Sequence, residues 1–326
     1  MTTFKEIRGN LIKSTSTDPA NPQDGQIWYN STSQVLKGEV FLEAWSSGGN
    51  LGTGRYGAGV GQDQNAAALV GLDAETPTAT NITEEYDGSS WTAGGSTGLT
   101  AYRRSAAGVQ TAGIAMGGFI APNSRQTGTE EYNGSTWTTG GSLPVGAQFG
   151  NASGPQTATL YAVYNTASGD SAEGLEYNGS SWTAGANLNT ARRQGAVIGA
   201  ATTLTSALVA GGFNPPGSPS DTTTTESYNG TSWTSVTGMS NARHASGSSG
   251  IGTSASVFGG STPDLTLTEN WNGTAWSATA NQATSVRRVH NGGGGTLAAL
   301  AMGGNPGSTA TEEFDYGPAT RTFTTS

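Results

Sequence analysis

The chain has no cysteine and only two histidines among its 326 residues. Without thiols it forms neither disulfide bridges nor thiolate metal sites, so its stability has to come from a packed core. The two histidines, His244 and His290, lack the His-x-x-x-His spacing typical of zinc sites, and no Gly-x-x-x-x-Gly-Lys phosphate loop occurs. These absences predict a protein that holds no metal and no cofactor and is not an enzyme.

Charge and long apolar runs are also scarce. Charged residues make up 11% of the chain, and the formal net charge is -9. Because a general affinity for nucleic acid needs lysines and arginines to displace phosphate counterions, we expect no nucleic-acid partner. No segment approaches the ~20 apolar residues of a membrane span, and residues 1–10 hold no apolar run of signal-peptide length. We therefore expect neither membrane insertion nor export by the Sec route.

The residues that are abundant favour short strands. Glycine alone supplies 51 residues, and serine, threonine and alanine are frequent. Such a composition is typical of many short strands joined by tight turns, and it leaves little material for amphipathic helices. We predict an all-β chain with almost no helix.

A phrase of the form Glu-Tyr-(Asn/Asp)-Gly-x-x-Trp recurs about every 46 residues, a period typical of propeller blades. Ahead of each phrase lies an apolar strand that ends in two small residues, as in Leu208-Val-Ala-Gly-Gly212. Ahead of that strand comes another that begins with arginine, as at Arg192-Arg193. Trp45 ends a degenerate earlier copy of the phrase. One structural unit is therefore repeated along most of the chain.

This order of an arginine-led strand, a Gly-Gly strand, a Tyr strand and a Trp strand resembles the kelch repeat over residues 50–323. The resemblance implies a β-propeller with four antiparallel strands per blade around a central channel. We count six blades, with seven as the open alternative. Because the last repeat has Phe323 in place of Trp, we expect the N-terminal strand around Val40 to Trp45 to complete or cover the ring. The predicted domains are an arm with a strand hairpin over 1–45 and a propeller over 46–326.

The periodic tryptophans admit two interpretations. Indole rings stack well on sugars, so these residues could line a carbohydrate-binding face. One tryptophan at a fixed position in every blade is, however, what packing between blades requires, and we favour this structural role. The residues are Trp91, Trp137, Trp182, Trp233 and Trp276.

Arginines gather at the start of the predicted innermost strands, and they also admit two interpretations. They could form a basic ring at one mouth of the channel that binds an anionic sugar or a carboxylate-bearing partner. The candidates are Arg103, Arg104, Arg192, Arg193, Arg243, Arg287 and Arg288. The favoured alternative is a ladder of ion pairs with repeated acids that fixes blade against blade. Those acids are Glu85, Glu131, Glu176, Glu226, Glu269 and Glu313.

Four Asn-Gly pairs followed by Ser or Thr fit both glycosylation sequons and hairpin turns. They begin at Asn133, Asn178, Asn229 and Asn272. Asp87-Gly88 holds the same place in the first repeat and cannot carry an N-glycan, so we favour the turn. The expected type is I′, in which both central residues take positive φ.

The N-terminal segment does not match the repeat. The phrase Asp24-Gly-Gln-Ile-Trp-Tyr-Asn-Ser-Thr-Ser33, followed by Leu36-Lys37, resembles a short module of bacteriophage structural proteins, particularly tail-fibre-like proteins. The resemblance implies a virion protein that docks to other virion proteins through its arm and presents its propeller to a host cell-surface polysaccharide. Since phage fibres are often trimers, it also implies a homo-oligomer.

Two alternatives to host recognition stay open. One is a purely structural virion component, such as a decoration, an adaptor or a tail part, that contacts only other virion proteins. The other is a carbohydrate-active enzyme, for which Asp170, Asp221 and Asp264 are isolated candidates. In either case we expect the functional surface on loops such as 121–125 and 214–221, because loops carry variation while strands preserve packing.

Overall fold

Every element in the described part of the chain is a β-strand. The computed structural model describes residues 12–22, 25–71, 80–199, 205–214, 221–261, 265–285, 290–292, 297–305 and 307–323. The prediction of an all-β chain is confirmed for these residues. They include no helix long and apolar enough to cross a membrane.

Five antiparallel sheets of four strands follow one another along the chain. The first contains β4 (Ala58–Asp63), β5 (Ala66–Val70), β6 (Thr83–Tyr86) and β7 (Trp91–Ala93). The second contains β8 (Ser105–Val109), β9 (Ala112–Met116), β12 (Thr129–Tyr132) and β13 (Trp137–Thr139). The third contains β14 (Asn151–Ser153), β15 (Thr159–Ala162), β18 (Glu173–Tyr177) and β19 (Trp182–Asn187).

The fourth sheet contains β20 (Ala196–Gly199), β21 (Ala207–Ala210), β22 (Thr225–Tyr228) and β23 (Trp233–Val236). The fifth contains β24 (Gly247–Ile251), β25 (Ser254–Phe258), β26 (Thr268–Trp271) and β27 (Trp276–Ala278). Between the second and third strands of two sheets lie short hairpins, β10 (Phe119–Ile120) with β11 (Ser124–Arg125) and β16 (Asn165–Thr166) with β17 (Gly169–Asp170).

A sixth sheet combines both ends of the chain in the strand order β1-β2-β3-β30-β29-β28. Its strands are β1 (Lys13–Thr15), β2 (Ile27–Asn30), β3 (Val35–Ser47), β28 (His290–Gly292), β29 (Ala298–Met302) and β30 (Thr311–Phe323). The N-terminal strand β3 is thus the neighbour of β30 in the last repeat. The expected completion of this repeat by the N-terminal strand is present.

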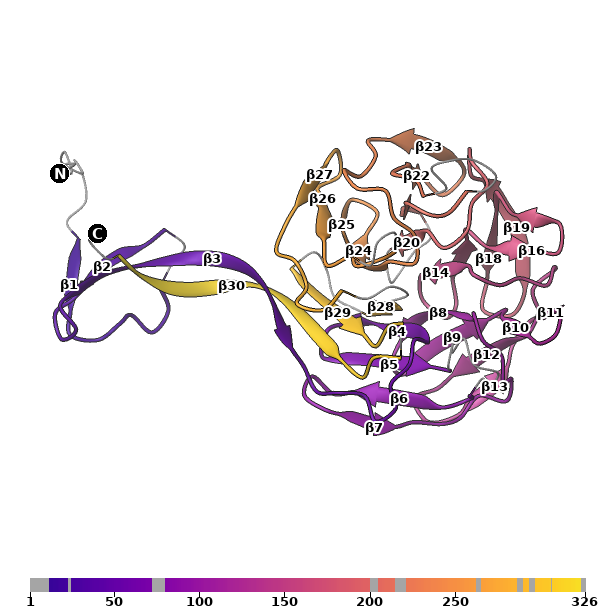
Figure 1. Ribbon diagram of the computed structural model, residues 1–326, viewed down its shortest axis with the longest axis horizontal. Coiled ribbons are helices and arrows are strands. Elements are labelled where there is room, and N and C mark those ends of the chain that lie inside the picture. The colour runs from indigo at the N-terminus through magenta and orange to yellow at the C-terminus, as the bar shows by residue number, and fades with distance from the viewer. Residues whose placement is uncertain are drawn as a thin grey trace. The chain divides into compact units, whose positions relative to one another are not determined.

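The first strands of the six sheets form a closed circuit. Contacts run from β4 to β8, β14, β20, β24 and β28 in turn, and β28 contacts β4 again. In Figure 1 the sheets surround this circuit, and the tryptophan-containing strands β7, β13, β19, β23 and β27 lie at the periphery. The arginine-led strands are therefore innermost, as the repeat order predicts.

The chain divides into two compact units. One is Trp45–Phe314, which contains the ring of sheets, and the other combines Met1–Ala44 with Asp315–Ser326. The predicted domains are 1–45 and 46–326, whereas residues 315–326 group here with residues 1–44 and not with the ring.

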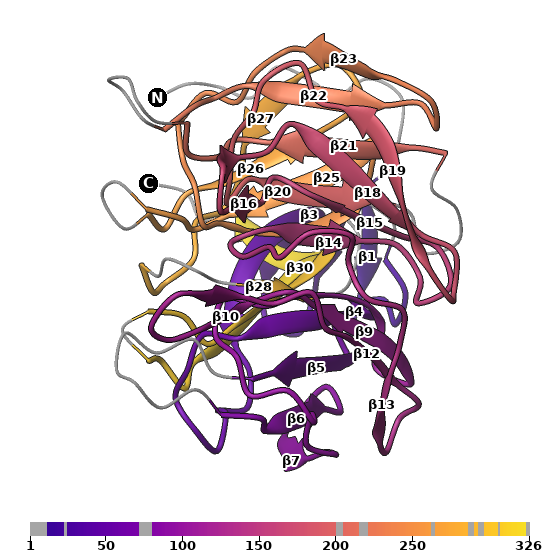
Figure 2. The same ribbon diagram turned by 90° about the vertical axis from the view of Figure 1, so that its right-hand side faces the viewer.

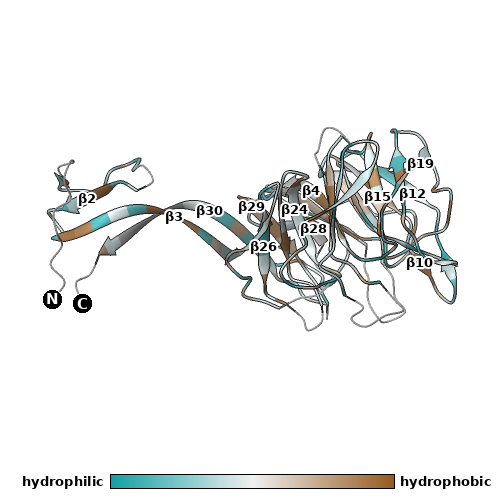
Figure 3. Ribbon diagram, turned by 90° about the horizontal axis from the view of Figure 1, so that it is seen from above, coloured by the Kyte–Doolittle hydropathy of each residue, from teal (hydrophilic) through white to brown (hydrophobic). Residues whose placement is uncertain are grey.

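Each sheet of the Trp45–Phe314 unit packs its apolar residues against the next sheet. Ile114 and Met116 of the second sheet, for example, share one buried cluster with Tyr161 and Leu175 of the third. The hydrophobic residues of this unit lie mainly within its strands (Figure 3). The core is therefore distributed around the ring between neighbouring sheets.

The Gly-Gly pairs mark points where the backbone of a neighbouring sheet comes close. Gly303 has a φ of 62°, and a Cβ atom there would lie 2.1 Å from the carbonyl oxygen of Arg55. Gly304 donates its backbone N–H to that same oxygen at 3.0 Å. Glycine satisfies both the left-handed conformation and the close approach, so this part of the repeat serves the joint between sheets.

The predicted hairpin turns are present, but their type is not the expected one. Gly134 has a φ of 89°, whereas Asn133 is not among the residues with positive φ, so the turn is not type I′. Instead, Asn133 Oδ1 accepts the backbone N–H groups of Ser135 and Thr136 at 3.0 and 2.9 Å. Asp87 makes the same two contacts in the first sheet. Asparagine is therefore selected here for its side-chain acceptor.

Candidate functional site

The periodic tryptophans bind the sheet that precedes their own. Trp137 donates its indole N–H to Thr83 Oγ1 at 3.0 Å. Trp182 repeats this contact with Thr129 Oγ1, also at 3.0 Å. The equivalent bonds run from Trp91 to Thr311, from Trp233 to the carbonyl oxygen of Ala186 and from Trp276 to Thr225. These positions agree with the structural role and leave the indole N–H groups engaged within the ring.

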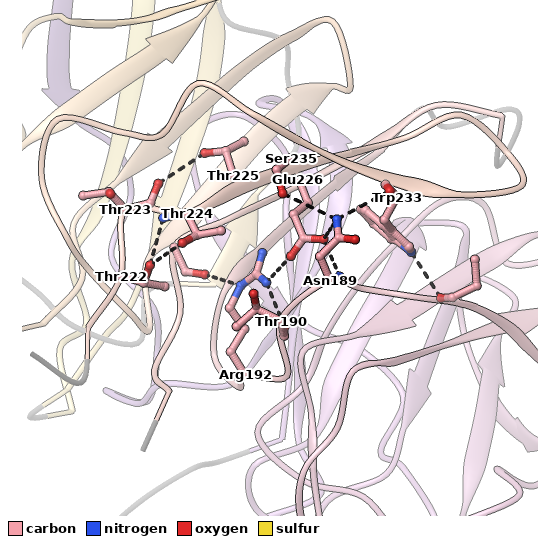
Figure 4. Close-up of polar contacts among 12 residues, drawn as sticks. Asn189, Thr190, Arg192, Thr222, Thr223, Thr224, Thr225, Glu226, Trp233 and Ser235 are labelled. Atoms are coloured by element: carbon pink, nitrogen blue, oxygen red, sulfur yellow. Dashed lines mark hydrogen bonds and ion pairs between the residues drawn. The ribbon is translucent and has the colours of Figure 1, made fainter. Parts of the chain in front are cut away.

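Four arginines are buried inside the sheets as partners of glutamates. Arg192 is fully buried, and its guanidinium donates to Glu226 Oε1 at 2.5 Å (Figure 4). It also donates to the carbonyl oxygens of Gly211 and Thr190. The other pairs are Arg55 with Glu84, Arg104 with Glu130 and Arg243 with Glu269. Because buried charges are costly unless hydrogen bonds satisfy them, these guanidinium groups are committed to the interior.

These ion pairs differ from the predicted ladder in two respects. Each joins an arginine just ahead of a sheet's first strand to a glutamate in the third strand of that same sheet, so the pairs do not connect the strands of one sheet to those of the next. In the first two sheets the arginine pairs with the first acid of a Glu-Glu sequence, Glu84 or Glu130. The second acid, as at Glu85, accepts a hydrogen bond from Tyr132 of the following sheet at 2.5 Å. Hydrogen bonds between tyrosine and glutamate therefore join neighbouring sheets.

The third sheet lacks both members of the ion pair. In the register of the sheet, Leu175 occupies the position of Glu226. Ala147 occupies the backbone position of Arg243, since its carbonyl group accepts the same hydrogen bond from a Gly-Gly pair. A buried charge without its partner destabilises the fold more than the absence of both charges does. The replacement of both residues in the third sheet therefore fits a structural role for the pairs.

A different set of side chains lies where each first strand begins. In four consecutive sheets, a residue ahead of the first strand forms a single bridge with a residue that follows the second strand. The bridged pairs are Tyr102 with Phe119, Gln148 with Asn165, Arg193 with Phe213 and His244 with Ser261. We call the surface formed by these pairs the bridge face. The hairpins that begin with β10 and β16 lie on one side of the ring (Figure 2), and both start with a bridged residue.

The backbone of the bridge face takes an uncommon conformation. Arg103, Phe149, Gln194 and Ala245 directly follow the bridged residues and have φ values of 60°, 59°, 57° and 52°. The N–H of Phe149 donates to Arg103, that of Gln194 to Phe149 and that of Ala245 to Gln194, at 3.3, 3.0 and 2.8 Å. Such left-handed residues cost about 1–3 kcal/mol each and concentrate at functional sites. This chain of strained residues marks the bridge face as the candidate site.

Arginines and aromatic rings alternate across this face. Arg103 Cζ lies 4.3 Å from the ring centre of Phe149 and 5.5 Å from that of Phe119. Arg193 Cζ lies 4.5 Å from the ring centre of Phe213 and 5.8 Å from that of Phe149. Phe149 therefore lies between two guanidinium groups, within the range of cation–π attraction.

Hydrogen bonds join the same arginines into what we call the arginine network. It consists of Arg103, Arg125, Arg193, Gln148, Asn165 and Asp170. Arg193 donates to Asp170 Oδ1 at 2.9 Å, and Arg125 donates to Asn165 Oδ1 at 2.9 Å. Asn165 Nδ2 donates to Asp170 at 2.7 Å and so connects the two contacts. The network spans three sheets.

Comparison with known proteins bears on the fold. The structure is similar to the solved structure of YjhT, with a TM-score of 0.61 and 12% sequence identity, over 82% of this chain and 97% of that chain. The chain has a β-propeller-like fold. No family model and no curated protein matches the sequence. The likeness shows the propeller architecture alone and brings no ligand or activity with it.

The residues predicted as a basic ring fall into three groups. The buried, paired ones are Arg104, Arg192 and Arg243. The partly exposed ones on the bridge face are Arg103 and Arg193. Those outside the described residues are Arg287 and Arg288, as is the candidate acid Asp264. Arg125, Phe149 and Phe213 were missed because they lie outside the repeated phrase, although Arg125 does lie in the loop 121–125.

His244 is the one bridged residue whose surroundings resemble a catalytic triad. Its Nδ1 lies 2.8 Å from Asp221 Oδ1, while Ser261 Oγ lies 2.9 Å from Nε2 and 3.4 Å from Nδ1. A hydroxyl so near both nitrogens lies over the ring and not in line with Nε2, unlike an aligned nucleophile and base. Ser96 centres a Gly-x-Ser-x-Gly pattern, but β7 precedes it and β8 follows it without a helix. Within the described ranges, no three His, Asp or Glu side chains are grouped to hold a metal.

Proposed function

We propose that this protein is a phage virion component whose six-bladed kelch propeller binds a host-surface polysaccharide at the bridge face. The unit that contains the N-terminal arm attaches it to other virion proteins. It acts as a binding module and not as an enzyme, and it reaches the virion by assembly in the host cytoplasm.

The observation that carries this proposal is a contrast between constant and varied positions. Tryptophan–threonine bonds, buried arginine–glutamate pairs and Gly-Gly joints recur from blade to blade. The bridged pair instead differs in each of the four blades where it occurs. Because all four pairs occupy one structural position, packing alone does not require them to differ. Variation at one structural position of a repeated frame is typical of a binding site.

The chemistry of the bridge face suits a sugar. Phe149 and Phe213 are partly exposed aromatic rings that sugars stack on, and the partly exposed Arg103 and Arg193 supply hydrogen-bonding groups beside them. Ligand sites commonly combine aromatic walls with a few polar groups in this way.

The six-blade count rests on the closure of the ring. Trp45 on β3 donates its indole N–H to Thr268 Oγ1 at 3.1 Å, as the other tryptophans donate to the preceding blade. Trp45 thereby takes the tryptophan position of the last repeat, and Phe323 does not. Among the described residues, six strands thus carry this inter-sheet tryptophan, one for each strand of the inner circuit.

The arm supports a docking role through its own small structure. Asp18 accepts hydrogen bonds from Trp28, Asn30 and Lys37 at 3.0, 2.7 and 2.6 Å. These three donors belong to the segment that resembles phage modules, so the resembling residues are those that organise the arm. Tyr29 alternates with Trp28 along β2 and is 38% exposed, which leaves an aromatic ring available to a partner.

Immunogold electron microscopy of purified particles tests the virion assignment. An antibody to the propeller is expected to label fibre tips. Label confined to the capsid or tail tube would favour a structural part instead. If the particles contain no such protein by mass spectrometry, the proposal is wrong.

Adsorption of the isolated protein to host cells tests recognition itself. Phe149→Ser is expected to reduce adsorption about 2- to 10-fold, since stacking on an aromatic ring contributes about 0.5–1.5 kcal/mol. Val109→Ser is the matched control, because Val109 is exposed in the β8–β9 hairpin and lies away from the bridge face. Equal adsorption by the two variants contradicts binding at the bridge face.

A further inference from the structure

The arginine network concentrates positive charge in an acidic protein. Its hydrogen-bonded members include three guanidinium groups, those of Arg103, Arg125 and Arg193, and one carboxylate, that of Asp170. The network therefore carries a formal charge of +2, whereas the whole chain carries -9. Such local excess is not expected from the general charge balance, and it requires a separate explanation.

Two guanidinium groups of the network, those of Arg103 and Arg125, have no carboxylate partner among the described residues. Arg193 has the carboxylate of Asp170 at 2.9 Å, and the buried arginines such as Arg192 each have a glutamate. Arg103 donates to the neutral amide oxygen of Gln148 at 3.1 Å, and in the described part of the chain it has no ion pair. Its Nε is buried and has no hydrogen-bond partner among those residues. The Nε atoms of Arg55, Arg104, Arg193 and Arg243 share this property, so the lack of an ion pair is what distinguishes Arg103 from these arginines.

Aromatic rings flank this guanidinium without neutralising it. The ring centres of Phe149, Tyr102 and Phe119 lie 4.3, 5.1 and 5.5 Å from Arg103 Cζ. They hold the guanidinium in place beside apolar rings of low dielectric constant, which strengthens its attraction for an anion at its edge. The backbone of Arg103 is fixed as well, since its carbonyl group accepts the N–H of Phe149. The cation is therefore preorganised before any ligand arrives.

We infer that the arginine network is an anion site and that the polysaccharide bound at the bridge face is acidic. This inference rests on the proposed function. Arg103 binds a carboxylate or sulfate group of the polymer, Arg193 contributes to the same positive field, and Phe149 stacks on the sugar that carries the acid. Neutral polysaccharides lack the group that completes the network.

Matched polymers provide the test. Full-length protein is titrated onto immobilised polygalacturonate and onto the same polymer with its carboxylates methyl-esterified, at ~0.15 M salt where long-range attraction is screened. A second matched pair is κ-carrageenan and its desulfated form. We expect one acidic polymer to bind at least about 10-fold more tightly than its neutral counterpart, because charge-assisted hydrogen bonds contribute about 1.5–3 kcal/mol. The pair that shows the difference identifies carboxylate or sulfate as the anion.

Two variants separate the site from general electrostatics. Arg103→Gln is expected to reduce binding to the acidic polymer at least about 10-fold. Lys13→Gln removes the same charge from an exposed residue of the arm and is expected to leave binding unchanged. Thermal unfolding verifies that both variants fold. If Arg103→Gln unfolds, Arg103→Lys keeps the charge but loses the guanidinium, and it should show the same reduction.

The outcomes distinguish failure of the anion site from failure of the proposed host recognition. Equal binding to acidic and neutral polymers, no binding to either acidic polymer, or equal loss in Lys13→Gln overturns the anion site. Host cells that adsorb wild-type protein and Arg103→Gln equally would also overturn it, while host recognition would stand. Host cells that adsorb no wild-type protein would overturn host recognition itself.

Discussion

Trp45 donates its indole N–H to Thr268 Oγ1 at 3.1 Å, although 223 residues separate the two in the chain. The same nitrogen lies 3.1 Å from the carbonyl oxygen of Ala280. The indole ring also packs 5.0 Å from Phe258 and 5.3 Å from Phe314. A residue near the start of the chain thereby joins the fifth blade to the last one.

Trp45→Ala is expected to destabilise the propeller by about 3 kcal/mol, because it removes a large packed ring from the point of closure. Trp45→Phe keeps an aromatic ring and loses the indole N–H, so a loss of about 1 kcal/mol is expected. Urea unfolding followed by intrinsic fluorescence measures both changes. Wild-type stability in Trp45→Ala would show that β3 does not close the ring.

The buried ion pair of Arg192 and Glu226 can be tested against the blade that lacks it. Arg192→Met alone leaves Glu226 buried without its partner and is expected to cost about 3–5 kcal/mol. The double variant Arg192→Met with Glu226→Leu imitates the third blade, where Leu175 replaces the acid, and should recover most of that loss. A double-mutant cycle from urea unfolding measures the coupling. Additive losses would contradict the joint role of the pair.

Alkaline pH should weaken the joints between blades. The Tyr86 hydroxyl donates to Glu313 of the preceding blade. Burial, followed by this hydrogen bond, raises the pKa of Tyr86 from 10.0 to about 12. Because the folded state holds the proton more tightly, the stabilising contribution is complete below pH 10 and is lost as the pH rises from 10 towards 12.

Urea midpoints measured from pH 9 to 11.5 should therefore fall less steeply for Tyr86→Phe than for the wild type. Tyr102→Phe serves as the control, since Tyr102 lies on the bridge face and not between blades. The same slope in wild type and Tyr86→Phe would show that this phenol does not contribute to the alkaline loss.

Asp18 and Asp87, two exposed carboxylates whose pKa values are lowered to about 2, should respond differently to replacement by asparagine. Lys37, then Asn30 and Trp28, lower the pKa of Asp18 to about 2, so its contribution is present above pH 4 and is lost as the pH falls towards 2. Asp18→Asn removes the charge that gathers these donors, and faster hydrogen exchange is expected over residues 27–37 at neutral pH.

Asp87→Asn is the matched control for Asp18→Asn. The backbone N–H of Ser90, then the hydroxyl and backbone N–H of Ser89, lower the pKa of Asp87 to about 2. Asn133 nevertheless makes equivalent contacts in the next blade. An amide oxygen is thus sufficient to accept the hydrogen bonds of this turn. We therefore expect Asp87→Asn to leave the hydrogen exchange of residues 83–93 unchanged. Equal effects of the two substitutions would mean that charge is not what organises the arm.

Much of the architecture was readable from the repeat itself. The period, the Gly-Gly pairs and the tryptophans specify sheets that pack one against another, because each is a local demand on backbone conformation or buried area. The ladder of ion pairs between arginines and repeated glutamates was predicted only in part. Sequence order shows Glu84 and Glu85 as equal neighbours, whereas alternation along β6 sends the first to Arg55 and leaves the second for Tyr132.

The amino-acid sequence by itself determined an all-β chain of repeated four-strand units with an extra N-terminal arm. Only the tertiary structure decided which arginines are buried against glutamates and which lie on the bridge face. Arg103 and Arg104 are adjacent in sequence, yet Arg104 is buried against Glu130 while Arg103 lies among aromatic rings on the bridge face. The physical reason is that burial and partners depend on the neighbouring strands and blades, which the ring brings together from distant parts of the chain.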